Sequence, residues 1–295
     1  MLCTKRALSA LVGIAVVALA GCATNTEGPP PPSGAEPVIQ TDQALTAKLP
    51  ADVKASGKLV VGIDPPYTPL EFVQDGKIVG FDVDVLDATA KVLGLRTDYR
   101  EAPFDKIIPA ITANTYTVGN SSFTDTKERE KTIDFVTYFN AGILWAAPTG
   151  ETVDPNAACG LSVAVKTGSY VDTKQVPALS EDCTKAGKPP INRMQFTSQD
   201  SATNAVVLGK AQAMAADSPL TAYAIKQSGD KLAQAGEISE AAPYGWVVAK
   251  GSPLGPVLQE ALQKLIDDGT YMKICERWGL QTGAITQSKI NDARS

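Results

Sequence analysis

The stretch that organises this chain runs from Ser121 to Arg129 and reads Ser-Ser-Phe-Thr-Asp-Thr-Lys-Glu-Arg. Thr126 stands three residues before Arg129, which suits a threonine that caps the start of a helix. An arginine in the first helical turn is opposed by the positive end of the helix dipole, and a bound anion could offset that cost. A guanidinium can bind a carboxylate through two parallel N–H groups. The stretch therefore predicts a small-ligand site, with hydroxyls and carbonyls for an ammonium group and Arg129 for a carboxylate. A solvated turn is the alternative, because residues 127–131 are all charged.

The composition excludes several classes of function. The chain has 295 residues, a net charge of −5 and no histidine. The acidic balance argues against a nucleic-acid partner. Without histidine there can be no Ser-His-Asp triad, no Cys-His pair and no histidine-containing zinc site. We therefore expect no metal and no cofactor, and the length allows two domains of moderate size.

The first 21 residues have the features of an export signal. Lys5 and Arg6 precede an apolar stretch at residues 7–20 that is too short for a comfortable membrane span. The stretch ends in Leu-Ala-Gly-Cys at residues 19–22, which is typical of a lipoprotein signal, although an ordinary signal peptide with a chance cysteine is the alternative. We expect cleavage before Cys22, a lipid such as palmitate on that cysteine, and an extracytoplasmic protein anchored to the cell membrane. Residues 22–56, which include the proline-rich run 28–34, are expected to form an extended tether without fixed structure.

Three further cysteines belong to the exported part of the chain, where the setting is oxidising. Cys159 and Cys183 flank one strand–helix unit, so we predict a disulfide between them. Three thiols allow three pairings, and the other two pairings stay open. Cys275 fits a buried position on a helix.

From residue 58 onward, strand patterns alternate with helix patterns. In the first module, residues 58–64, 97–101 and 116–121 predict strands, and 82–93 and 104–113 predict helices. Residues 133–147 contain two extended runs, and after Pro148 the rhythm starts again. This second part has predicted strands at 161–166, 193–199, 211–216 and 244–249, and helices at 201–210, 220–227 and 257–266. The order predicts an α/β fold of two modules with parallel strands and right-handed crossovers. Ligands bind at the carboxyl ends of strands in such sheets, which makes candidates of Asp64, Ser121, Gly168 and Asp217.

Five segments in order carry a resemblance to a known family: residues 62–69, 79–84, 104–110, 124–135 and 268–280. From about Gly57 to Leu280 the chain resembles the polar amino-acid-binding proteins of ABC importers, the type II periplasmic binding proteins of family 3. The resemblance implies a two-lobed "Venus flytrap" fold with two β-strand hinge segments. Lobe 1 would comprise residues 57–141 and 243–280, lobe 2 residues 142–242, and the C-terminal tail residues 281–295.

The resemblance also implies a role for each candidate residue. Arg129 would clamp the α-carboxylate of the ligand, together with the backbone N–H groups of Ser169 and Tyr170 at a helix start. The α-ammonium group would be bound by Thr124, by the backbone carbonyl of Ser122 and by the counter-ion Asp217. The ligand side chain would lie between Tyr67 and Phe104, with Asp64 and Ser121 at its distal polar atoms.

Three departures from the family pattern affect the expected shape of the pocket. Leu70 stands where an aromatic residue is usual, and residues 117–120 replace an apolar strand that carries an aspartate. Tyr170 stands where a small hydroxyl residue is common.

The implied function is a non-enzymatic, monomeric binding protein that captures a free polar or cationic amino acid by hinge closure. It would deliver this ligand to the permease subunits of an ABC importer. Asp64 favours a polar or cationic side chain. The alternatives are a periplasmic dehydratase on the same fold, which would use a cleft carboxylate as an acid, and a ligand-sensing module for a separate signalling partner.

Overall fold

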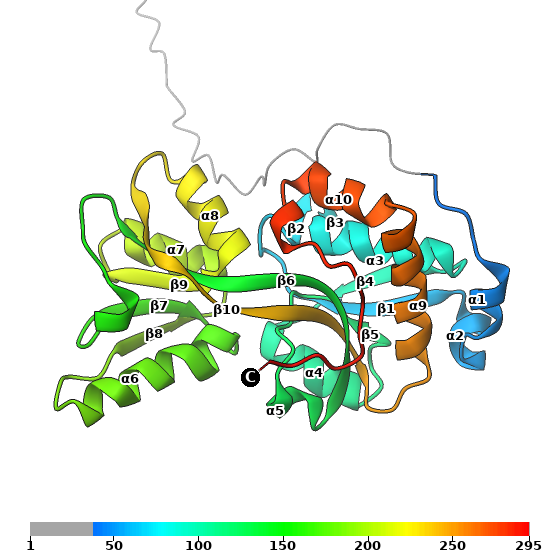
Figure 1. Ribbon diagram of the computed structural model, residues 1–295, viewed down its shortest axis with the longest axis horizontal. Coiled ribbons are helices and arrows are strands. Elements are labelled where there is room, and N and C mark those ends of the chain that lie inside the picture. The colour runs from blue at the N-terminus through cyan, green and yellow to red at the C-terminus, as the bar shows by residue number, and fades with distance from the viewer. Residues whose placement is uncertain (1–37, 295) are drawn as a thin grey trace, which may run out of the picture.

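The computed structural model describes residues 38–294 and contains two α/β lobes side by side, joined by two long strands (Figure 1). The left half of the figure holds α6, α7 and α8, and the right half holds α3, α4, α9 and α10. The predicted two-lobed α/β fold is therefore confirmed. The predicted signal peptide and the lipidation site Cys22 lie outside the described residues.

One eight-stranded sheet runs through both lobes in the order β4-β1-β5-β10-β6-β9-β7-β8. Within each lobe the outer strands are parallel, whereas β6 and β10 run antiparallel to each other and to their neighbours. A separate two-stranded hairpin, β2 with β3, lies in lobe 1. The strands are β1 (Lys58–Ile63), β2 (Phe72–Gln74), β3 (Lys77–Val79), β4 (Arg96–Glu101), β5 (Val118–Gly119), β6 (Ile133–Pro148), β7 (Ser162–Lys166), β8 (Asn192–Phe196), β9 (Ala213–Asp217) and β10 (Leu232–Ala249).

Helices cover both faces of this sheet and bury its apolar side chains. In lobe 1, α3, α9 and α10 pack on one face and α4 on the other; in lobe 2, α6 and α7 take opposite faces. The helices are α1 (Gln43–Ala47), α2 (Ala51–Ser56), α3 (Phe81–Val92), α4 (Phe104–Thr112), α5 (Lys127–Glu130), α6 (Val176–Lys185), α7 (Gln199–Val207), α8 (Ser218–Gln227), α9 (Leu254–Asp267) and α10 (Thr270–Trp278), with short turns at Pro155–Ala157, Val171–Gln175 and Gln281–Gly283.

The two connecting strands are longer than the sequence pattern indicates. β6 is one continuous strand of 16 residues, and β10 has 18 residues and begins at Leu232 rather than at Tyr244. Residues 236–241 are all exposed, so they lack the apolar alternation that marks a strand. Backbone pairing with β6, with register shifts after Ala235 and Ser239, holds this part of β10 in place.

The expected unstructured tether ends earlier than residue 56, because residues 43–56 form α1 and α2. The Asp42 carboxylate caps α1 by accepting from the Ala44 and Leu45 N–H groups at 2.9 and 3.2 Å. Leu45, Leu49 and Val53 are buried in the lobe 1 core. Apolar contact with lobe 1 therefore orders a stretch for which the sequence analysis predicted no structure.

Residues 284–294, which we call the C-terminal strap, lie across the lobe 1 end of β6. Thr137 N–H donates to the strap at the Lys289 carbonyl (2.9 Å), and the Asn291 N–H donates to the Phe135 carbonyl (3.1 Å). At its end, the Arg294 guanidinium lies 3.3 Å from Asn140 Oδ1, where β6 leaves lobe 1. The strap thus ties the chain end to a connecting strand.

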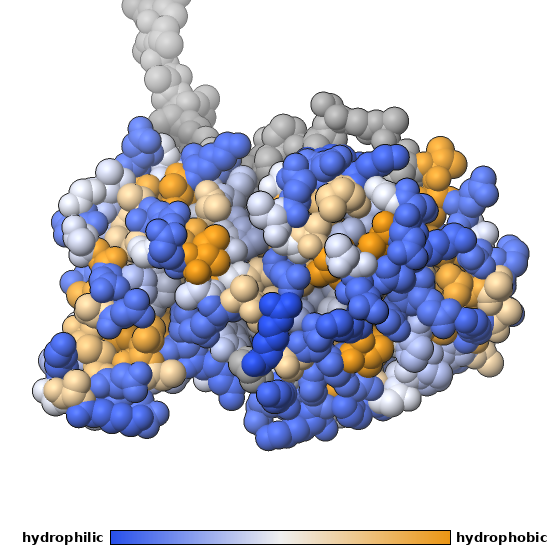
Figure 2. Space-filling view, in the orientation of Figure 1, coloured by the Kyte–Doolittle hydropathy of each residue, from blue (hydrophilic) through white to orange (hydrophobic). Residues whose placement is uncertain are grey.

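Between residues 38 and 294, no helix is both long and apolar enough to cross a membrane. The face shown in Figure 2 is mostly hydrophilic, with hydrophobic residues in small separate groups.

The predicted disulfide between Cys159 and Cys183 is confirmed, and Cys275 is a buried free thiol as expected.

The disulfide spans 24 residues. Replacing both cysteines with serine should lower the free energy of unfolding by about 3 kcal/mol in the loop-entropy model. Urea denaturation of the variant against the parent checks this, and an unchanged midpoint and slope would contradict it.

Candidate functional site

Arg129 lies where the local sequence predicts, in the short helix α5. The Thr126 hydroxyl oxygen accepts from the Arg129 N–H at 3.2 Å, which is the predicted cap. The guanidinium then turns inward: Nη1 donates to the Thr124 carbonyl at 2.8 Å and Nη2 to the Gly168 carbonyl at 3.2 Å. Gly168 follows β7 in lobe 2, so Arg129 bridges the two lobes.

Two stacked aromatic rings lie beside Arg129. Its guanidinium carbon lies 5.7 Å from the centre of the Phe104 ring and 5.8 Å from that of Phe123. Burial lowers the pKa of Arg129 to about 10, while the carboxylates of Asp217 and Asp125 act in the opposite direction. The group therefore remains a cation at neutral pH and can serve as an anion receptor.

Asp217 supplies the opposite charge from lobe 2. It is the last residue of β9 and directly precedes α8, and it is buried. Tyr67 Oη donates to Asp217 Oδ2 at 2.6 Å, which is a second contact between the lobes. Burial raises the pKa of Asp217, and Tyr67, Tyr244 and Arg129 oppose that rise.

The space between Tyr67 and Phe104 holds a side chain that the sequence analysis did not single out. The Lys166 ammonium lies 4.7 Å from the centre of the Tyr67 ring and 5.4 Å from that of Phe104. The Lys166 ammonium also lies 2.6 Å from Asp64 Oδ2. The two groups form an ion pair, but their geometry is not that of a hydrogen bond. Lys166 ends β7, so the rule that identified Asp64 at the end of β1 applies to it equally.

Ser121 and Ser122 are buried, and each contacts a buried acid. The Ser121 hydroxyl donates to Glu71, and the Ser122 N–H and hydroxyl both donate to Asp82 Oδ2, at 2.9 and 2.7 Å. Glu71 and Asp82 were not among the predicted site residues. Asp82 lies in one of the segments that carry the family resemblance, whereas no sequence signal pointed to Glu71.

The predicted amide donors of lobe 2 have partners of their own in the structure. The Ser169 N–H donates to the Lys166 carbonyl at 3.2 Å. The side chain of Tyr170, not its predicted N–H, donates to Glu240 at 2.9 Å. The residue of this loop that contacts Arg129 is Gly168. A role for the Ser169 and Tyr170 N–H groups in carboxylate binding stays a prediction.

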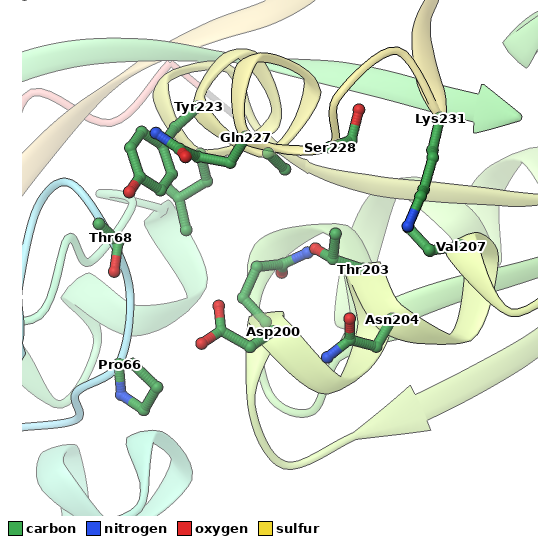
Figure 3. Close-up of a pocket in the computed structure, with 13 residues that line it drawn as sticks. Pro66, Thr68, Asp200, Thr203, Asn204, Val207, Tyr223, Gln227, Ser228 and Lys231 are labelled. Atoms are coloured by element: carbon green, nitrogen blue, oxygen red, sulfur yellow. The ribbon is translucent and has the colours of Figure 1, made fainter. Parts of the chain in front are cut away.

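A cavity of about 520 Å³ lies beside this cluster, between the lobes. Figure 3 shows Pro66 and Thr68, the chain neighbours of Tyr67, on one side, and Asp200, Thr203 and Tyr223 of α7 and α8 on the other. The cavity therefore extends the cleft outward from Tyr67.

Three comparisons place this geometry among known proteins. Residues 59–281 match the model of the bacterial extracellular solute-binding proteins, family 3. The chain is 38% identical over 293 residues to the arginine-binding protein ArgT of Corynebacterium glutamicum, which covers 98% of this chain and 96% of ArgT.

Solved structures agree in fold. An ancestral arginine-binding protein has been solved bound to arginine and bound to glutamine, each with a TM-score of 0.69 and 30% identity. Those matches cover 75% and 76% of this chain and 98% of the ancestral chain. The ancestral amino acid-binding protein AncCDT-1, described as a precursor of cyclohexadienyl dehydratase, matches with a TM-score of 0.65 at 30% identity over 77% of this chain and 97% of its own. With its two lobes, its charged residues at the strand ends and these matches, the chain belongs to the bacterial extracellular solute-binding proteins of family 3.

Proposed function

We propose that this chain is the lipid-anchored, extracytoplasmic binding protein of an ABC importer for an amino acid. The protein would be held at the membrane by a lipid on Cys22 and would act as a monomer. It would close its lobes on the ligand and deliver it to the permease subunits. The placement of Arg129 and Asp217 supports this proposal most directly. Their opposite charges come from separate lobes and lie in the same buried region between the lobes, next to Tyr67.

A zwitterion fits this pair of charges. Its carboxylate would bind Arg129, and its ammonium group would bind Asp217, Thr124 and the Ser122 carbonyl. In this structure those sites are engaged by protein groups, since Arg129 contacts Gly168 and Asp217 contacts Tyr67 across the lobes. A ligand that bonds both lobes at once favours the closed arrangement, because only that arrangement makes both sets of contacts.

The Asp64–Lys166 pair narrows the class of side chain that the site would accept. The pair is neutral overall, and Lys166 is almost fully buried. A cationic side chain would have to take Asp64 from Lys166 and leave that ammonium group buried without its partner, which is costly. A carboxamide or ureido group can donate to Asp64 and accept from Lys166 without breaking the balance of charge. Glutamine, asparagine and citrulline therefore fit better than arginine or lysine.

Arginine is the second candidate ligand, because ArgT is named as an arginine-binding protein and the ancestral relative has been solved with both arginine and glutamine. A thermal-shift screen of purified protein against these five amino acids, with leucine as an apolar control, separates the candidates. We expect the largest rise in melting temperature with a carboxamide or ureido ligand. A larger rise with arginine or lysine would contradict the neutral-ligand assignment but keep the amino-acid function.

Asp217→Asn should weaken amino-acid binding by about 2–5 kcal/mol, because the ligand ammonium would lose its buried counter-ion. Isothermal titration calorimetry with the best ligand of the screen measures this loss. Asp182→Asn, which neutralises an exposed carboxylate on α6, is the matched control and should bind like the parent. Equal affinity of Asp217→Asn and the control would show that Asp217 does not bind the ligand ammonium and serves only its contact with Tyr67.

We propose that binding leaves the ligand chemically unchanged, although the relative AncCDT-1 is described as the precursor of a dehydratase. Incubating the protein with each ligand and recovering the ligand intact by mass spectrometry tests this. Recovery of a dehydrated product would instead establish the enzymatic alternative.

A further inference from the structure

Two acidic side chains, Glu71 and Asp82, are completely buried behind Ser121 and Ser122. The start of α3 brings them together, since the Asp82 N–H donates to the Leu70 carbonyl at 2.9 Å. Gly80 permits this approach: its φ is +143°, and a Cβ there would lie 2.1 Å from the Leu70 carbonyl oxygen. The absence of a side chain at Gly80 therefore lets the first turn of α3 pack closely against the segment that contains Glu71.

Asp82 holds Ser122 in an unfavourable backbone conformation. Ser122 has a φ of +50°, in the left-handed region that a non-glycine residue rarely adopts. Two hydrogen bonds to Asp82 Oδ2, from the Ser122 N–H and hydroxyl, secure it there. The orientation of the Ser122 carbonyl, which the proposed function assigns to the ligand ammonium, thus depends on Asp82.

The remaining oxygens of the two acids need a proton. Glu71 Oε2 and Asp82 Oδ1 are shielded from solvent, and neither has a hydrogen-bond partner among residues 38–294. Each acid acts on the pKa of the other, so the two side chains are neighbours in the interior. Two ionised carboxylates this close repel, whereas a single proton between them gives both oxygens a partner.

The neighbouring charges do not provide a substitute for that proton. The groups that act on Glu71 are Asp82 of α3, Asp64 after β1, and Lys166 of β7, which already pairs with Asp64. Two neutral phenols, Tyr67 and Tyr138 of β6, also border the acids. The Tyr138 hydroxyl can donate to Asp82, but the Tyr67 hydroxyl donates to Asp217, so neither phenol provides a donor for Glu71. Lys166 is the only cation among these groups, and it is already paired with a third carboxylate, that of Asp64.

We propose that Glu71 and Asp82 share one proton and act together as positioning residues that hold Ser121 for the ligand side chain and Ser122 for the ligand ammonium group. Burial raises the pKa of Glu71 well above its usual value, and it raises that of Asp82 to about 6. A carboxyl whose pKa is higher in the folded than in the unfolded chain stabilises the fold at low pH, and this stabilisation is lost as the pH rises through the folded value. The unfolded chain loses its carboxyl protons near their ordinary pKa values, whereas the folded pair keeps one, so stability should fall as the pH rises from 5 to 8.

The direct test uses Glu71→Gln, because an amide donates the same hydrogen bond to Asp82 and cannot lose it. Melting temperatures are measured without ligand from pH 5 to 8 for the parent, for Glu71→Gln and for Glu151→Gln, an exposed control. We expect the parent and the control to lose about 3–6 °C more than Glu71→Gln over this range. Parallel pH profiles of all three proteins would overturn the shared proton. Should Glu71→Gln fail to fold, Glu71→Met removes the same titration and serves in the same comparison.

A second arm tests the positioning role, which rests on the proposed function. Affinities for L-glutamine and L-arginine are measured at pH 5.5 and 8 by calorimetry. Because the folded pair keeps its shared proton over this range, we expect the parent and Glu71→Gln to bind alike at both pH values. Glu71→Met, which lacks the hydrogen-bonding group, should bind about tenfold more weakly. An affinity of Glu71→Met equal to that of the parent would overturn the link to the ligand. If neither amino acid binds the parent at any pH, the ligand assignment fails, while the melting profiles still decide whether the proton is shared.

Discussion

Arg129→Ala should abolish amino-acid binding in calorimetry while leaving the melting temperature of the ligand-free protein nearly unchanged. The guanidinium is the cation that reaches the interior from α5, and a buried carboxylate without its partner costs about 3–5 kcal/mol. That cost corresponds to a loss of affinity of at least about a hundredfold. The fold depends less on this side chain, because its two hydrogen bonds go to backbone carbonyls and not to a buried charge.

Two further variants sharpen the result for Arg129. Lys131→Ala removes an exposed cation next to the same helix and should bind like the parent. Arg129→Lys keeps the charge but loses the paired N–H geometry, so it should show intermediate affinity. Undiminished binding by Arg129→Ala would refute the carboxylate assignment.

Lys166→Met should change which amino acids the protein prefers. Methionine has a similar length and no charge, so Asp64 would lose its internal partner and could accept a cationic side chain. We expect affinity for L-arginine to rise and affinity for L-glutamine to fall, each by about tenfold or more, because a charged hydrogen bond to a buried group contributes about 1.5–3 kcal/mol. Calorimetric titration of both ligands into the parent and the variant measures the reversal.

The control for Lys166→Met is Lys174→Met, which removes an exposed lysine from the same lobe and should leave both affinities as they are. If Lys166→Met still prefers L-glutamine over L-arginine by the same ratio as the parent, the Asp64–Lys166 pair does not select the side chain.

Local signals in the sequence were sufficient for part of the site. The Thr126 cap and the position of Arg129 follow from one short motif, and Asp64 and Asp217 follow from the rule that strand ends carry ligands. Lys166 obeys the same rule. Its ion pair with Asp64 could not be predicted from the sequence, because the two residues are about a hundred positions apart and lie in different lobes.

Other features could not be read without the tertiary structure. Glu71 reads as an ordinary polar residue before a turn, and only the approach of α3 shows that it is fully buried. The first half of β10 has exposed residues and exists because β6 lies beside it. Across α1, α2 and the turn between them, the apolar residues Leu45, Leu49 and Val53 recur every four positions. Such short helices are stable only when packed on lobe 1.

The C-terminal strap offers a practical route to an optical sensor of amino acids. Arg294 lies against Asn140 and Ala241, where the two connecting strands pass between the lobes. An environment-sensitive fluorophore on a cysteine at position 294 would sit at the proposed pivot. Its emission would then report the proposed closure in real time, without any label inside the binding cleft.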